Sequence, residues 1–272
     1  MLLLNGKEIA NIIAEDLKLK ISSLENVPSL VVIQVGNNAA SNTYIKVKQK
    51  LGKRLGIPVL VHKFSEDIDN ITILEAINFC NQDETVGGII IQLPLPSHLN
   101  KYELLNAIHF TKDIDGLGLI NAGKLLKQDI TGKLPATPKG VITLLKKNNI
   151  ILTGKKVVVI GRSLLVGTPL AILLSQENAT VTLCHSHTEK LSEITREADI
   201  LISAIGKPHI ITKEFVKNDA IIVDVGSTFI NGELYGDVDF EDVQTKVSAI
   251  TPVPGGVGPM TVISLFQNLL GD

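Results

Sequence analysis

The stretch "KKVVVIGRSLLVGTPL", residues 155–170, decides the fold of the second half of the chain. Its apolar run followed by Gly161 predicts a strand of the parallel kind, buried on both faces and closed by a turn. Thr168 and Pro169 then predict the N-cap and the first position of a helix. Strand, glycine turn and helix start a βαβ unit, in which free backbone N–H groups at the helix N-terminus would face a phosphate.

The glycine spacing of this turn departs from the dinucleotide fingerprint G-x-G-x-x-G. Ser163 and Val166 stand where the second and third glycines would be, and Gly167 follows. The motif alone therefore leaves two interpretations open, a nucleotide-binding turn and a plain structural βαβ turn.

On both sides of this stretch, short apolar runs alternate with helical patterns, which is typical of a parallel α/β sheet. The expected strands are 29–36, 57–64 and 86–93 in the first half and 155–161, 179–185, 198–206 and 219–226 in the second, with helices centred on 44–55, 71–81 and 260–270. A polar, glycine-containing stretch starting at Asn121 separates the halves. We predict two α/β domains with a cleft between them. They are 1–121, completed by the final helix 259–272, and a Rossmann-like domain, 122–258.

Composition excludes several classes of protein. The 272 residues suggest about two domains, and 26 basic against 28 acidic residues give a net charge of −2. With no long basic run, nucleic acid and anionic membranes are not expected as partners. Cys80 and Cys184 lie far apart and form no C-x-x-C pair, so we expect no disulfide framework, no metal site and a cytoplasmic location. No apolar stretch is long enough to span a bilayer.

One lysine of the predicted helix "SNTYIKVKQKLGKRL", residues 41–55, lies on an unexpected side. On a helical wheel, the expected core-facing stripe is Tyr44, Val47, Leu51 and Leu55, and the solvated lysines opposite are Lys46, Lys50 and Lys53. Lys48 instead lies beside Leu55 and shares a face with Ser41 and Tyr44. Burial there would lower the pKa of the amine and prepare it for proton transfer. The alternative is a stem packed along the core edge with its head in water.

The end of the strand expected at 179–185 bears on cofactor choice. An NAD-selective chain usually has an acidic residue there for the ribose 2′-hydroxyl. In "LCHSHT" the first carboxylate after the strand is that of Glu189, while Arg162 and Ser186 are available. A guanidinium without a carboxylate tolerates a 2′-phosphate, so NADP is favoured over NAD. We interpret His185 and His187 as solvated loop residues.

Three more features follow predicted strands, where open α/β sheets bind ligands. Gln92 closes an apolar run, and its amide needs a partner in the loop or in a ligand. Asp113 and Asp115 in "FTKDIDG" are candidates for a site, although Asp before Gly is commonly a turn former. The loop "TPVPGGVGPMT", 251–261, has a backbone that allows close approach to a flat ligand.

Five segments together resemble one family: "SNTYIKVK", "IIIQLPLP", "KDIDG", "GRSLLVGTP" and "TPVPGGVGPMT". They occur in the order and approximate spacing of bifunctional methylenetetrahydrofolate dehydrogenase/methenyltetrahydrofolate cyclohydrolase, over nearly the whole chain. The resemblance implies that NADP+ accepts hydride from 5,10-methylenetetrahydrofolate. Water then opens the methenyl cation to 10-formyltetrahydrofolate. It also implies a homodimer that acts on tetrahydrofolate derivatives.

The resemblance assigns roles to residues. It makes Lys48 the central catalytic group, assisted by Tyr44 and Gln92, and makes Asp115 the anchor of the pterin. Ser41 and the loop from Pro254 to Gly258 are expected to line the same site. The predicted cofactor contacts are Gly161, Arg162, Ser163, Val166, Gly167, Ser186 and Ser227.

Two departures from the family pattern affect this assignment. Ser227-Thr228 follow "VDVG" where the family usually has Ile-Asn, and "GLGLINAG" follows Asp115 in place of the commoner aromatic or His-Pro versions. The first leaves cofactor affinity open, and the balance of the two activities is open as well. Two alternatives remain: another NAD(P)-dependent dehydrogenase, with an Arg or Lys clamp for a substrate carboxylate, and a nucleotide-sensing module without catalysis.

Overall fold

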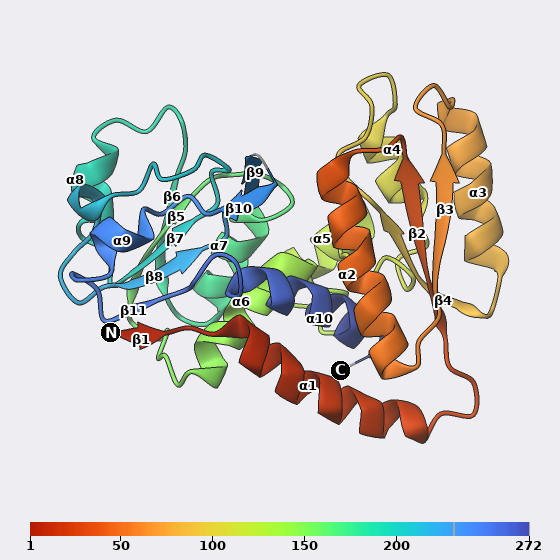
Figure 1. Ribbon diagram of the computed structural model, residues 1–272, viewed down its shortest axis with the longest axis horizontal. Helices are drawn as coiled ribbons and strands as arrows, with labels where there is room; N and C mark the ends of the chain where they lie inside the picture. Colours follow the sequence, from red (N-terminus) through yellow and green to blue (C-terminus); the bar gives the residue numbers. More distant parts are fainter. Residues whose placement is uncertain (231, 272) are drawn as a thin grey trace. The chain divides into compact units, whose positions relative to one another are not determined.

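The computed structural model describes residues 1–230 and 232–271, which fold as a mixed α/β protein of two compact units (Figure 1). Unit 1 comprises Met1–Asn11 and Thr137–Thr261, and unit 2 comprises Ile12–Ala136 and Val262–Asp272. The boundaries between them fall inside two helices, α1 (Gly6–Ser22) and α10 (Val257–Leu270), and at the start of α6 (Ala136–Lys147). Among the described residues, no helix combines the length and the apolarity needed to cross a membrane.

Unit 1 is built on a parallel sheet that has six strands within the described residues (Figure 1). Their order is β1 (Leu2–Leu3), β11 (Ala249–Ile250), β8 (Ile221–Asp224), β7 (Ile200–Ser203), β5 (Lys156–Ile160) and β6 (Thr180–Cys184). The unit also contains α7 (Gly167–Gln176), α8 (Leu191–Thr195), η1 (Lys213–Phe215), α9 (Phe240–Val243) and the antiparallel hairpin of β9 (Thr228–Ile230) and β10 (Glu233–Tyr235). All strands that the sequence predicted here are present.

Burial on both faces, expected for the strand at 155–161, is confirmed for β5 but does not extend to its neighbour β6. Its residues are mostly exposed, whereas β5 and β7 beside the middle of the sheet are almost fully buried. The reason is topological, because β6 pairs only with β5 and forms an edge of the sheet. A strand covered on both faces requires neighbours and helices that an edge position does not provide.

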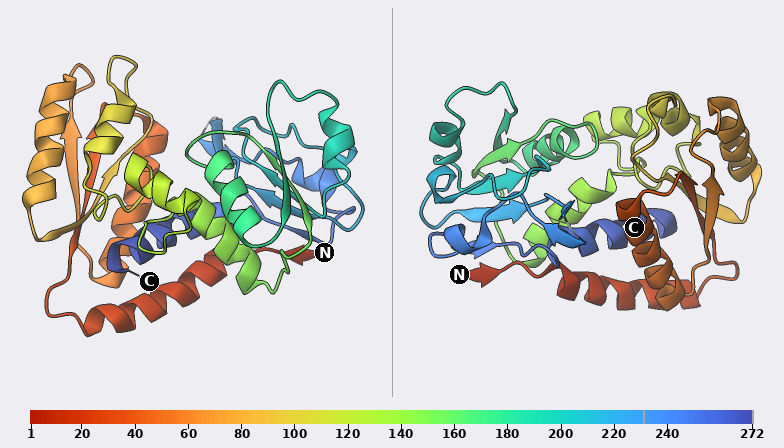
Figure 2. Two further views of the ribbon diagram at one scale, coloured as in Figure 1. Left: turned by 180° about the vertical axis from the view of Figure 1, so that it is seen from behind. Right: turned by 45° about the horizontal axis from the view of Figure 1, so that its top comes forward.

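Unit 2 contains a parallel sheet that, in the described part of the chain, has the order β3 (Val59–Phe64), β2 (Ser29–Val35) and β4 (Val86–Ile91). Its helices are α2 (Ala39–Leu55), α3 (Asn70–Gln82), α4 (Lys101–Ala107) and α5 (Leu119–Leu126), together with most of α1 and α10. Figure 2 shows the three strands from two further sides, with α3 and α2 alongside them. Apolar residues of α3 and α4 cover one face of the sheet.

A glycine allows α2 to lie close to the sheet. A Cβ on Gly52 would be 2.3 Å from Cγ2 of Val59 on β3, and 3.6 Å from the ring of Phe266 on α10. Since Phe266 is completely buried, α10 and α2 pack together against this side of unit 2. The close approach lies at the start of β3, while the first turn of α2 lies at the other end of the sheet, where Oγ of Ser41 donates to the carbonyl of Leu93 after β4.

The expected boundary at Asn121 is corrected in two ways. Asn121 is completely buried in unit 2, where its Nδ2 donates to the carbonyl of Phe110 and its Oδ1 accepts from the backbone N–H of Lys133. The chain therefore leaves unit 2 only after Ala136. The N-terminal residues belong to unit 1 and not to unit 2, because β1 pairs in parallel with β11.

Candidate active site

Lys48 lies on the buried face of α2. The helix begins after Asn38, whose side chain accepts the backbone N–H of Ser41, and it ends at Gly56 in the left-handed conformation (φ 80°). The buried residues of the helix are Ser41, Ile45, Lys48, Gly52 and Leu55. Only 7% of Lys48 is exposed, so the interpretation with its head in water is wrong.

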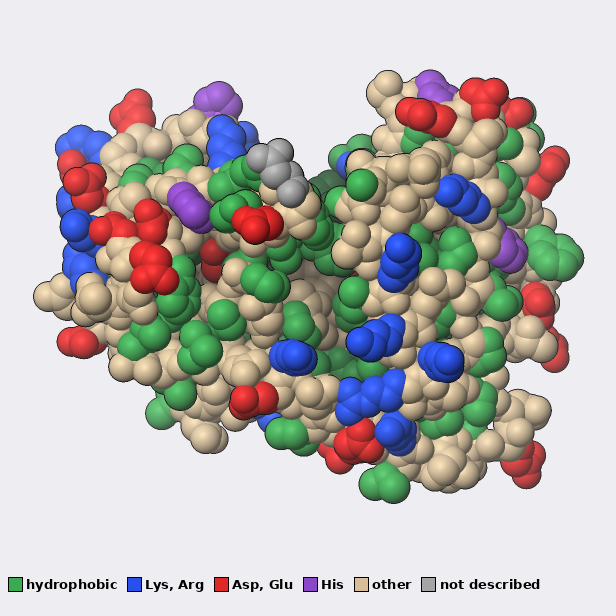
Figure 3. Space-filling view, in the orientation of Figure 1, with side chains coloured by type: hydrophobic (Ala, Val, Ile, Leu, Met, Phe, Trp, Pro, Cys, Tyr) green, Lys and Arg blue, Asp and Glu red, His purple; other side chains and the backbone are tan. Residues whose placement is uncertain are grey.

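The helical wheel placed the core-facing stripe with a rotational error. Val47, expected in the core, is 44% exposed, and Ile45 takes its place. The stripe is rotated because α2 packs against β3 at Gly52. A helical wheel of apolar side chains leaves this residue out, since glycine has no side chain. Lys46, Lys50 and Lys53 are exposed as predicted, and basic side chains gather along α2 in Figure 3.

Lys48 is hydrogen-bonded to Gln92, the residue that follows β4. Nζ of Lys48 donates to Oε1 of Gln92 over 2.7 Å, and both side chains are buried. Nε2 of Gln92 donates to the carbonyl of Leu93 over 2.9 Å, and Oγ of Ser41 donates to the same carbonyl. Because the amide nitrogen is committed to Leu93, the carbonyl oxygen of Gln92 faces the amine.

Asp115 is the charged partner of Lys48. Burial raises the pKa of the Asp115 carboxyl to about 6; the positive charge of Lys48 opposes this shift and the negative charge of Asp113 adds to it. Burial also lowers the pKa of Lys48, and the charge of Asp115 offsets part of that effect. The two groups are thus both shifted towards their neutral forms, which places their proton exchange closer to neutral pH.

The segment that carries Asp115 is fixed on both sides by buried polar contacts. Nζ of Lys112 donates to three carbonyls at the end of α3, those of Cys80, Asn81 and Asp83. The carboxylate of Asp113, 1% exposed, accepts from the backbone N–H groups of Leu117 and Gly118 and from Nδ2 of Asn121. Asp113 is therefore an anchor of this loop, and Asp115 is the carboxylate that faces Lys48.

Unit 2 thus brings together Ser41, Tyr44, Lys48, Gln92 and Asp115, all expected at one site. Tyr44 is half-buried and lies one helical turn before Lys48. Pro254 and Gly258 belong to unit 1, in the loop and helix start that follow β11. The backbone N–H of Lys7 holds this loop through the carbonyl of Gly255.

The residues expected to bind a cofactor are gathered in unit 1, after strands β5, β6 and β8. Gly161 has a φ of 113°, and a Cβ there would be 2.3 Å from the carbonyl oxygen of Ala204. A Cβ on Gly167 would be 1.8 Å from the carbonyl oxygen of Gly161, so both glycines are required by close backbone contact. Arg162, Ser163, Ser186 and Ser227 are exposed and Val166 is half-buried. Parallel neighbouring strands place these loops at one edge of the sheet.

The prediction that Thr168 is the N-cap of α7 is wrong. The helix begins at Gly167, and Thr168 is inside it; Oγ1 of Thr168 donates to the carbonyl of Arg162. Oγ of Ser163 accepts the backbone N–H of Val166 and so caps the turn before the helix. The sequence rule failed because Gly167 can enter the helix where its backbone packs against Gly161.

Two buried carboxylates were not predicted. Asp224 ends β8 and Asp237 follows β10; they are 3% and 0% exposed, and both accept several backbone N–H groups. A signal was present for Asp224, since it closes an apolar strand just as Gln92 does. Asp237 in "YGDVDF" resembled an ordinary loop residue.

Comparison with known proteins decides the family. The model of the tetrahydrofolate dehydrogenase/cyclohydrolase catalytic domain matches residues 4–115, and the model of the NAD(P)-binding domain of the same family matches residues 135–272. The chain belongs to the tetrahydrofolate dehydrogenase/cyclohydrolase family. The resemblance noted in the sequence is thereby confirmed.

Relatives of this family match over nearly the full chain. The bifunctional protein FolD of Clostridium novyi is 47% identical over 98% of this chain and 97% of its own length. Among solved structures, the bifunctional FolD of Campylobacter jejuni has a TM-score of 0.97 at 45% identity, covering 99% of this chain and 97% of that one. The Trypanosoma brucei enzyme, solved with NADP cofactor and inhibitor, has a TM-score of 0.95 at 34% identity, covering 99% and 96%.

These matches confirm the predicted fold class and the predicted enzyme. The chain is a methylenetetrahydrofolate dehydrogenase and methenyltetrahydrofolate cyclohydrolase of folate one-carbon metabolism. Unit 2 corresponds to most of the catalytic-domain match, and unit 1 to most of the NAD(P)-binding match.

Proposed function

We propose that Lys48 acts in the cyclohydrolase step as the group that moves the proton of the attacking water. The observation that carries this proposal is the buried hydrogen bond from Nζ of Lys48 to Oε1 of Gln92, beside a carboxylate whose pKa is about 6. The methenyl group is a cation, so a charged Lys48 would repel it, whereas a neutral amine accepts a proton. Burial lowers the pKa of Lys48 and so increases the neutral fraction.

Hydrolysis of the methenyl group forms one bond, breaks one bond and releases one proton. The oxygen of water forms a bond to the methenyl carbon, and the bond from that carbon to N5 of the folate breaks. Of the two protons of water, one ends on N5 and one is released. We propose that Lys48 accepts the proton that leaves the water as its oxygen attacks the methenyl carbon. Gln92, which is held by Leu93, orients the amine.

Residues of unit 2 are proposed to bind the substrate. The Asp115 carboxylate would accept two parallel hydrogen bonds from the amino-pyrimidine edge of the pterin, and Tyr44 would offer a flat face to the aminobenzoyl ring. Ser41 already donates to the carbonyl of Leu93, so we propose that it acts by holding the turn after Gln92. The loop from Pro254 to Gly258 is proposed to contact the folate as well.

NADP is proposed as the cofactor, with the contacts at Gly161, Arg162, Ser163, Val166, Gly167, Ser186 and Ser227. The chain fits NADP, because Gly161 and Gly167 place no side chain over the backbone of the turn between β5 and α7. This turn leads into the N-terminus of α7, where free N–H groups can bind a phosphate. When bound, the nicotinamide supplies the hydride acceptor. Arg162 and Ser186 are exposed and follow the paired strands β5 and β6, which suits a 2′-phosphate.

Replacing Arg162 by alanine is expected to raise KM for NADP+ by about tenfold or more, because a guanidinium–phosphate contact is a strong charge-assisted hydrogen bond. KM for NAD+, which has no 2′-phosphate, should change by less than about twofold. Both constants come from initial rates with methylenetetrahydrofolate. Arg196→Ala, at an exposed arginine of the same unit, is the control. Equal losses for the two cofactors would contradict the assignment.

One assay separates this function from the alternatives. Initial rates with methylenetetrahydrofolate and NADP+ or NAD+, followed by absorbance, should show reduction of NADP+ and formation of 10-formyltetrahydrofolate. Another NAD(P)-dependent dehydrogenase would not turn over the folate, and a nucleotide-sensing module would bind NADP without any turnover. The homodimeric state and the cytoplasmic location stay predictions, and sedimentation of the purified protein tests the first.

A further inference from the structure

Asp237 of unit 1 is a completely buried carboxylate held only by neutral donors. Its Oδ2 accepts from Oγ of Ser203 over 2.8 Å and from the backbone N–H of Ile205 over 2.7 Å. Its Oδ1 accepts from the backbone N–H of Lys207 over 2.9 Å. Among the described residues, no cation is a hydrogen-bond or ion-pair partner of this carboxylate. Burying a carboxylate without a cation is costly unless hydrogen bonds compensate, so the three donors are what keeps the Asp237 carboxylate in place.

Asp224 forms the second part of the same cluster. Its Oδ1 accepts from the backbone N–H groups of Gly226 and Asp237, and its Oδ2 accepts from that of Val238. The backbone N–H of Asp224 donates to Oγ1 of Thr251, at the start of the loop that leads to Pro254. The two carboxylates therefore tie the segment after β10 to the ends of β7 and β8, and the backbone of Asp224 links it to the end of β11.

Two glycines show how tightly these segments interlock. A Cβ on Gly226 would lie 2.3 Å from Oδ1 of Asp237, and a Cβ on Gly236 would lie 2.0 Å from Oδ2 of Asp224. A side chain at position 226 would therefore collide with the Asp237 carboxylate, and one at position 236 would collide with the Asp224 carboxylate. Ser227, a proposed cofactor contact, is the residue directly after Gly226.

The cluster also reaches the β5–α7 turn. Ser203 and Ile205, both donors to Asp237, flank Ala204, and the carbonyl of Ala204 lies where a Cβ of Gly161 would be, 2.3 Å away. The backbone N–H of Ala204 donates to the carbonyl of Ile160. Asp237 therefore holds the backbone of residues 203–205, against which Gly161 packs. Its carboxylate also packs against Gly226, the residue before Ser227.

We propose that Asp237 is a positioning residue for the cofactor: with Asp224, it sets the distance between the loop that follows β7, the loop that follows β8 and the turn at Gly161. Asp237 itself is fully buried. Its effect passes through the loops that carry the proposed NADP contacts. The inference rests on the proposed function, since it assumes that NADP binds at this edge of the sheet.

The test is Asp237→Asn in the full-length enzyme. Three donors face the two oxygens of Asp237, so an amide would keep its oxygen towards Ser203 and Ile205 and turn its own N–H groups against Lys207. We expect KM for NADP+ to rise about tenfold or more, with kcat of the dehydrogenase changed less than about threefold. The cyclohydrolase rate on methenyltetrahydrofolate, measured without NADP at saturating folate, should stay unchanged, because Lys48 and Gln92, the residues proposed to move its proton, lie in unit 2.

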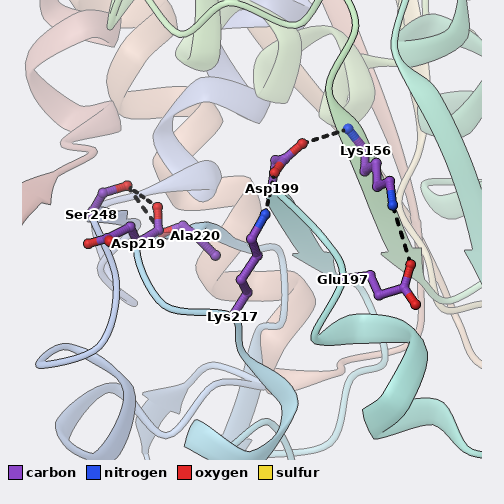
Figure 4. A network of polar contacts seen from close by, with 7 residues as sticks. All are labelled: Lys156, Glu197, Asp199, Lys217, Asp219, Ala220 and Ser248. Atoms are coloured by element: carbon purple, nitrogen blue, oxygen red, sulfur yellow. Dashed lines mark hydrogen bonds and ion pairs between the residues drawn. The ribbon is translucent and has the colours of Figure 1, made fainter.

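A matched control lies at the amino ends of the strands of the same sheet. Asp199, before β7, accepts the backbone N–H of Lys156 and Nζ of Lys217 (Figure 4). Asp199→Asn removes a carboxylate of the same sheet with a similar number of partners, at the amino ends of the strands. KM for NADP+ should stay within about twofold of the original value, because the contacts of Asp199 are partly exposed.

A second variant covers the possibility that Asp237→Asn does not fold. Ser203→Ala removes one donor to Asp237 and no charge, and it should raise KM for NADP+ about two- to fivefold with an unchanged cyclohydrolase rate. An unchanged KM for NADP+ in Ser203→Ala, or in a folded Asp237→Asn, would overturn the proposal. An equal rise in Asp199→Asn would also overturn it. If the original enzyme bound no NADP, the proposed function would fail first, which keeps the two conclusions separate.

Discussion

Replacing Lys48 by methionine is expected to lower kcat of the cyclohydrolase by about a thousandfold, the usual range for a lost general acid–base group. Methionine preserves the length of the stem in the buried slot on α2 and removes only the amine. Without the amine, Oε1 of Gln92 loses its donor, and the group proposed to take the proton of the attacking water is removed. NADP binding should persist, because the proposed cofactor contacts are all in unit 1.

The control for this variant is Lys50→Met. Lys50 is on the same helix, and its side chain is exposed, so the substitution removes an amine without touching the buried face. We expect cyclohydrolase activity within about twofold of the original enzyme, as is usual for exposed positions. Formation of 10-formyltetrahydrofolate at the original rate by Lys48→Met would refute the role of the lysine. Loss of activity in both variants would point instead to a general electrostatic effect of α2.

The strands were predictable because burial leaves a local signal. Runs such as 157–160 are apolar without interruption, since helices cover both faces of a parallel strand. The same reasoning identified Lys48 and Gln92, because a polar group in an apolar context needs a partner, and these two side chains are partners of each other. The roles of Tyr44, Asp115 and the cofactor residues came from the family resemblance.

Other features depended on contacts distant in sequence. The rotation of α2 is set by Gly52 against Val59, which a helical wheel does not contain. The pairing of β1 with β11 joins the two ends of the chain, and no local pattern announces it. Asp237 was missed for the same reason, because its donors come from the end of β7, more than 30 residues earlier.

Asp115→Asn is expected to raise KM for methylenetetrahydrofolate about a hundredfold, because two charge-assisted hydrogen bonds to the pterin would be weakened. The amide has nearly the same shape as the carboxyl but carries no charge and offers one oxygen. KM for NADP+ should stay constant, since Asp115 belongs to unit 2. Asp129→Asn, at an exposed aspartate of the same unit, serves as the control. A folate KM within about twofold of the original would contradict the anchoring role.

The pH dependence of the same constant gives an independent test. Burial raises the pKa of Asp115 to about 6, so the carboxyl is mainly ionised above that pH and mainly neutral below it. The ionised form is the one that accepts both hydrogen bonds, and KM for the folate should therefore rise as the pH falls through about 6. In Asp115→Asn nothing titrates at this position, and the rise should disappear. A rise of the same size in both proteins would assign the titration to another group or to the folate itself.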